Sequence, residues 1–97
     1  VLLPAPYWVS YSAIATLAEA ESNIIPSSIE SDFKITPEQL EAAITPKTKL
    51  VMFNSPNNPS GTIYSDEEYR SLGKVLEKYP NYFDSVKILI YLRYIII

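Results

Sequence analysis

Short apolar runs of strand length alternate with helical patterns along this sequence. One run ends at Pro4, a second ends at Pro26, a third extends from Thr48 to Phe53, and a fourth begins at Val86. In the segments between them, apolar residues recur every three or four positions, which is the spacing of one helix face. A chain with this alternation folds into a largely parallel sheet covered by helices, with right-handed crossovers. We therefore expect an α/β fold.

Two of the expected helices carry clear start signals. Thr36, Pro37 and Gln39 form a capping box with proline at the first helical position. Ser65 and Glu68 form a second capping box.

The first helix is marked less clearly, and Ser10 or Ser12 is expected to cap it. Its expected apolar face comprises Tyr11, Ile14, Leu17 and Ala18.

Composition excludes several kinds of function. A net charge of −3, with both signs mixed along the chain, argues against nucleic-acid binding and against an anionic membrane surface. Cysteine and histidine are absent, so neither a zinc site nor a Ser-His-Asp triad can form within these 97 residues. The apolar C-terminal run carries Lys87 and Arg93 and is too short to span a bilayer. We expect a soluble, cytoplasmic protein without a membrane segment or a metal site.

The chain begins with valine and closes on three isoleucines, so both ends look cut. We therefore expect residues 1–97 to be a single partial domain of a longer protein.

Two unusual segments follow expected strands. "PAPYW" follows the first strand, and "NSPNNPSG", Asn54–Gly61, follows the third. In open α/β sheets, ligands bind at the carboxyl ends of the strands, where such loops begin. The prolines around Asn58 restrict its backbone, so its amide would lose little entropy on binding a ligand. Trp8 offers a flat apolar face for a planar heterocycle, although an ordinary turn and a core tryptophan are the alternatives.

"PYWVSY" followed by "NSPNNPSG" resembles the class I and II aminotransferases, pyridoxal-phosphate enzymes of the aspartate aminotransferase type. The resemblance runs from about Leu2 to Pro80 and includes "FKITPEQLEAAITPKTKLVMF" between the two motifs. It implies part of the large domain of a fold-type I pyridoxal-phosphate-dependent transferase. We divide the chain into a family-like part, residues 1–81, and a divergent apolar tail, residues 82–97.

The resemblance also implies a function in amino acid metabolism. The enzyme would transfer an amino group between an amino acid and a 2-oxo acid, and it would act as a homodimer. Trp8 would stack on the pyridine ring of pyridoxal 5'-phosphate and lie near the substrate carboxylate. Asn58 would donate its amide to the phenolic oxygen of the cofactor and contact the same carboxylate. Cis peptide bonds are implied before Pro6 and Pro59.

No catalytic residue can be assigned within the chain. The lysine that binds the cofactor covalently, the phosphate-binding turn and the substrate-binding arginine are not placed. The acid that holds the pyridine nitrogen protonated is not placed either, because Asp84 comes too early. Lys87 fits the protection of an exposed strand edge better than it fits the cofactor lysine. The isolated segment is expected to be inactive. Two alternatives stay open: another pyridoxal-phosphate enzyme of this fold, such as a lyase or synthase, or a non-catalytic remnant or α/β binding module.

Overall fold

Three parallel segments form the centre of the fold in the computed structural model, which describes residues 1–80. β1 (Leu2–Pro4) pairs in parallel with β2 (Asn23–Ile25), with Leu3 opposite Ile24. On its other edge, β1 forms an isolated parallel bridge between Leu2 and Val51. β1 therefore lies between its two neighbours, as expected of a parallel α/β sheet.

The third expected strand, Thr48–Phe53, is wrong in extent, because only a single bridge forms there. The backbone N–H of Leu2 donates to Leu50 over 2.8 Å, and that of Met52 donates to Leu2 over 3.1 Å. In a parallel ladder the next bond on this edge would need an N–H at position 4. Proline has none, so the ladder ends at Pro4.

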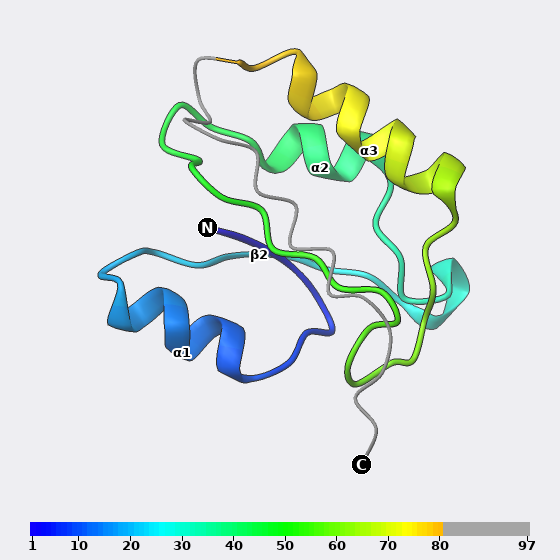
Figure 1. Cartoon of the computed structure of the whole chain (residues 1–97), viewed down its shortest axis with the longest axis horizontal. Coiled ribbons are helices and arrows are strands. Elements are labelled where there is room, and N and C mark those ends of the chain that lie inside the picture. Colours follow the sequence, from blue (N-terminus) through cyan, green and yellow to red (C-terminus); the bar gives the residue numbers. More distant parts are fainter. Residues whose placement is uncertain (81–97) are drawn as a thin grey trace.

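Helices cover the central strands on two sides. α1 (Ser10–Leu17) lies on one side of the strands, and α2 (Pro37–Ala43) and α3 (Asp66–Glu77) lie together on the other (Figure 1). A short 3-10 helix, η1 (Ile29–Ser31), connects β2 to the α2 side. The expected strand from Val86 and the expected divergent tail lie outside the described residues.

The capping boxes of α2 and α3 are confirmed. In α2, Thr36 Oγ1 accepts from the Gln39 N–H at 3.1 Å, and Gln39 Oε1 accepts from the Thr36 N–H at 2.9 Å. Ser65 and Glu68 exchange the same pair of bonds at 3.1 and 2.8 Å. Each box satisfies two backbone donors that the first helical turn leaves free.

The expected serine cap of α1 is wrong. Val9 holds the cap position without a side-chain bond, and its φ and ψ of −53° and −28° are already helical. The Tyr11 N–H donates to the Trp8 carbonyl, and the Ser12 hydroxyl donates to the Val9 carbonyl. A side-chain cap requires an extended residue at the helix entry, and this helix begins instead from a turn at Trp8.

The core lies between the central strands and the α2–α3 side. Leu2, Leu3 and Leu40 are completely buried. From α1, only Tyr11 and Ala15 are buried, whereas Leu17 is 85% exposed. The expected apolar face of α1 is therefore only partly used within the described residues.

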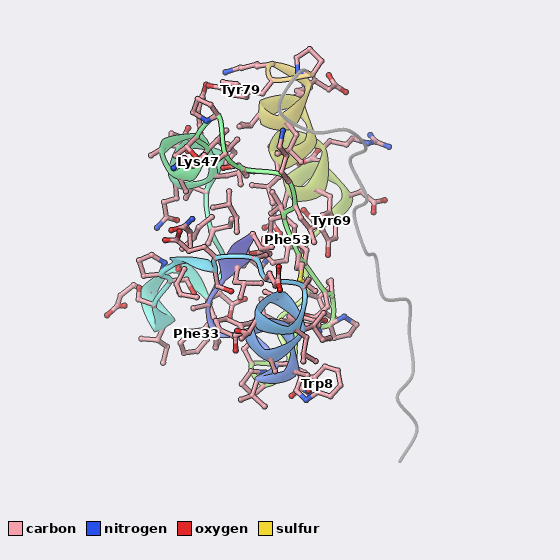
Figure 2. All side chains as sticks on the ribbon, turned by 90° about the vertical axis from the view of Figure 1, so that its left-hand side faces the viewer. Trp8, Phe33, Lys47, Phe53, Tyr69 and Tyr79 are labelled. Atoms are coloured by element: carbon pink, nitrogen blue, oxygen red, sulfur yellow. The ribbon has the colours of Figure 1, made fainter. Side chains whose placement is uncertain are left out.

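Two neighbouring tyrosines differ in how their hydroxyls are satisfied. The rings of Tyr64 and Tyr69 lie 5.4 Å apart. Phe53 packs edge-to-face against Tyr64 and against Tyr69, and Figure 2 shows Phe53 near Tyr69. The Tyr64 hydroxyl accepts the buried Ile35 N–H at 2.9 Å. The Tyr69 hydroxyl is buried beside the Ser55 side chain and has no hydrogen bond of good geometry within the described residues.

Replacing each tyrosine with phenylalanine is expected to give opposite results. Tyr64→Phe leaves the buried Ile35 N–H without an acceptor and is expected to lower the free energy of unfolding by about 1–3 kcal/mol. Tyr69→Phe removes an unpaired hydroxyl and is expected to leave that free energy unchanged or to raise it. Urea unfolding followed by circular dichroism measures both variants, and equal losses would contradict this account.

Candidate functional site

Two loops meet at the carboxyl ends of the central strands. The Trp8 loop, residues 5–9, follows β1, and the asparagine loop, residues 54–61, follows the bridge at Val51. The peptide bonds before Pro6 and Pro59 are cis, so both expectations for these bonds are confirmed. A third cis bond, before Pro56, was not predicted by the sequence pattern.

The asparagine loop closes on itself through a tight turn. The Gly61 N–H donates to the Asn57 carbonyl at 2.7 Å, and the Asn57 N–H donates to the Thr62 carbonyl at 2.8 Å. Gly61 has a φ of 73°, a left-handed conformation that glycine adopts without steric cost. Both backbone polar groups of Asn57 are thus bonded to the last residue of its loop and to the residue that follows it.

The side chain of Asn57 connects the two loops. Its Nδ2 donates to the Pro6 carbonyl at 2.8 Å and to Ser60 Oγ at 2.8 Å. An amide nitrogen carries two protons, and two acceptors are in place for them. The sequence pattern singles out Asn58 and gives no reason to choose Asn57. The only signal in the sequence is that two asparagines stand side by side between prolines.

Trp8 and Asn58, the two predicted site residues, are both on the surface. Trp8 is 46% exposed and packs edge-to-face against Tyr11, with ring centroids 5.9 Å apart. Figure 2 shows it at the periphery of the molecule. Asn58 is exposed and makes no hydrogen bond to the residues that the structure describes. Its amide is therefore available to a ligand.

The two predicted residues lie close to the ends of the Asn57–Pro6 hydrogen bond. Asn58 directly follows Asn57, and Trp8 comes two residues after Pro6. Because consecutive Cα atoms are about 3.8 Å apart, the chain keeps both residues close to this bond. The structure thus brings the two backbones together on one side of the sheet. A shared ligand for the two side chains stays a prediction.

A small recess, partly open to solvent, lies between the loops. The rings of Tyr7, Phe33, Phe53 and Tyr64 form much of its wall, and Asn57 contributes to it as well. Neither Trp8 nor Asn58 lines it. Burial raises the pKa of Tyr64, so its hydroxyl stays protonated at neutral pH.

The polar side chains that the two loops supply are amides, hydroxyls and the Trp8 indole N–H, which can donate hydrogen bonds to a ligand. Neither loop contains a lysine, an arginine, an aspartate or a glutamate. Within residues 1–80, no cluster of three or more acidic side chains could hold a metal ion. None of the helices within the same residues has the length and the apolar character needed to cross a membrane.

Comparison with known proteins shows which family shares this sequence pattern. The family model described as "Aminotransferase class I and II" matches residues 1–84, which include both loops. An aspartate/prephenate aminotransferase of Nitrosomonas europaea is 56% identical over 81 residues, which are 84% of this chain and 20% of that protein. An aspartate aminotransferase of Rhizobium meliloti is 48% identical over 81 residues, with the same coverage of each chain.

Solved structures agree with the sequence matches. A structure of the aspartate aminotransferase from Rhizobium meliloti superposes with a TM-score of 0.80 and 46% identity, covering 84% of this chain and 20% of that one. The Thermus thermophilus aspartate aminotransferase with maleate gives a TM-score of 0.79 and 34% identity, with 84% and 22% covered. The chain therefore spans about 20% of the length of the relatives that it matches.

The two adjacent asparagines are expected to differ in their effect on stability. Asn57→Ala removes two hydrogen bonds and is expected to lower the free energy of unfolding by about 1–3 kcal/mol. Asn58→Ala changes an exposed side chain and is expected to change the free energy of unfolding by less than about 0.5 kcal/mol. Thermal and urea unfolding of both variants measure the difference. A larger loss in Asn58→Ala would refute the assignment of the bridging role to Asn57.

Proposed function

Because this chain belongs to the class I and II aminotransferases, we propose that it forms part of the large domain of a pyridoxal-phosphate-dependent enzyme. That enzyme transfers an amino group between an amino acid and a 2-oxo acid. The observation that carries the proposal is the junction of the two loops, where one hydrogen bond holds together the segments that carry Trp8 and Asn58.

The side chains at this junction fit pyridoxal phosphate in two respects. Trp8 keeps nearly half of its surface exposed and can stack on a pyridine ring. Asn58 has a free amide, which can donate to the anionic phenolic oxygen of the cofactor. When bound, the cofactor supplies a conjugated ring that takes up electrons from the substrate. Trp8 and Asn58 bind and orient that ring, and neither loop holds a lysine to anchor it.

The names of the relatives support a narrower substrate class. Relatives between 48% and 56% identical are named aspartate/prephenate or aspartate aminotransferases, and we propose aspartate as the amino donor. The homodimer and the cytoplasmic location expected from the sequence stay predictions. The 97-residue chain alone is expected not to catalyse the transfer, because the cofactor lysine is not placed within it.

A chimera tests the proposal. The 81-residue matching stretch of the Nitrosomonas europaea enzyme is replaced by the corresponding residues of this chain, so that the host supplies the lysine. The chimera is expected to bind pyridoxal phosphate and to transfer the amino group of aspartate to 2-oxoglutarate. A folded chimera that binds no pyridoxal phosphate would favour the binding-module alternative.

Variants of the chimera test the two predicted residues. Asn58→Ala loses a charge-assisted hydrogen bond and is expected to weaken cofactor binding roughly 10- to 100-fold. It should also raise the pH midpoint of the visible absorbance of the bound cofactor, because the lost bond favours the deprotonated form. Trp8→Phe keeps a stacking ring and should weaken binding less than Trp8→Ala does. Unchanged binding in both Asn58→Ala and Trp8→Ala would refute these roles.

A further inference from the structure

We propose that Asn57 is a positioning residue, whose side-chain amide sets the relation between the Trp8 loop and the asparagine loop. It would act on the cofactor only through its neighbours. The functional consequence rests on the proposed function, whereas the link between the loops rests on geometry alone.

Of the backbone groups of Ala5 and Pro6, only the Pro6 carbonyl is left for pairing with the asparagine loop. Pro6 has no N–H, and the Ala5 N–H donates to the Ile25 carbonyl at 2.9 Å. The Ala5 carbonyl accepts the hydroxyl of Ser27. The Pro6 carbonyl is an acceptor, so it pairs with a donor from the other loop.

Asn57 supplies that donor from a fixed position. Its backbone N–H and carbonyl are bonded to Thr62 and Gly61, and its second amide proton is held by Ser60. The 2.8 Å bond to the Pro6 carbonyl therefore starts from a residue that is anchored at three other points. A displacement of the Trp8 loop relative to the asparagine loop has to break or stretch this bond.

The consequence for ligand binding follows from the chain order. Trp8 lies two residues beyond the acceptor, and Asn58 is the residue next to the donor. Within the described residues, the bond between Asn57 and Pro6 is the one hydrogen bond that joins the loop of Trp8 directly to the loop of Asn58. Without it, each side chain keeps its own chemistry but loses its fixed relation to the other.

Asn57→Asp in the chimera removes the hydrogen-bond donor of the side chain and nearly keeps its shape. Aspartate is nearly isosteric but places an acceptor against the Pro6 carbonyl. The variant is expected to weaken pyridoxal phosphate binding roughly 2- to 10-fold and to raise the pH midpoint of the cofactor absorbance, as Asn58→Ala does. Asn23→Asp is the matched control, because it makes the same change at an exposed asparagine of β2, outside both loops. That control is expected to leave both quantities unchanged.

A double variant distinguishes positioning from a general loss of structure. If Asn57 acts through Asn58, Asn57→Asp adds no further shift of the pH midpoint to Asn58→Ala. Equal effects of Asn57→Asp and Asn23→Asp, or no effect of Asn57→Asp on binding and midpoint, would overturn the proposal.

A readout without cofactor keeps the inference separate from the proposed function. Trp8 is the single tryptophan of the 97-residue chain, so its fluorescence reports on this loop alone. Asn57→Asp is expected to shift the emission and to increase quenching by acrylamide, whereas Asn23→Asp is not. This result would support the link even if the chimera bound no pyridoxal phosphate. Unchanged emission in Asn57→Asp would overturn the link.

Discussion

Parallel pairing on both edges of β1 is the constraint on which the rest of the structure depends. Leu2 bonds to the backbone around Val51 on one edge, and β1 pairs with β2 on the other. Leu2 and Leu3 are also completely buried, so hydrogen bonding and the hydrophobic effect fix the same strand. Because parallel strands end at the same edge of a sheet, this pairing brings the Trp8 loop and the asparagine loop to one place.

Local signals predicted much of this fold because they are complete within a few residues. The boxes at Thr36 and Ser65 each need only a hydroxyl and an acceptor three positions later, and both form as expected. The serine cap of α1 failed because Val9 is already helical, which depends on the turn at Trp8. The third strand failed in extent because its partner lacks an N–H at Pro4. The sequence contains that proline, but not the register that turns its nitrogen toward the Met52 carbonyl.

The candidate site also contains some features that the sequence predicts and others that it does not. A sequence motif indicates which residues have useful chemistry, and it singles out Trp8 and Asn58. It cannot indicate which amide turns inward, because that depends on where the Pro6 carbonyl lies. Asn57 and Asn58 have the same chemistry and differ only in orientation. Residues that hold a site together are therefore harder to predict than residues that face a ligand.

The tandem asparagines place a limit on the length of the loop. One amide is consumed by the Pro6 carbonyl and Ser60, so it has no proton left to offer elsewhere. Attachment to the neighbouring loop and the proposed ligand contact thus use two side chains on consecutive residues. Deleting one residue between Pro56 and Pro59 would leave a single carboxamide, which could not both bond the Pro6 carbonyl and donate to a ligand.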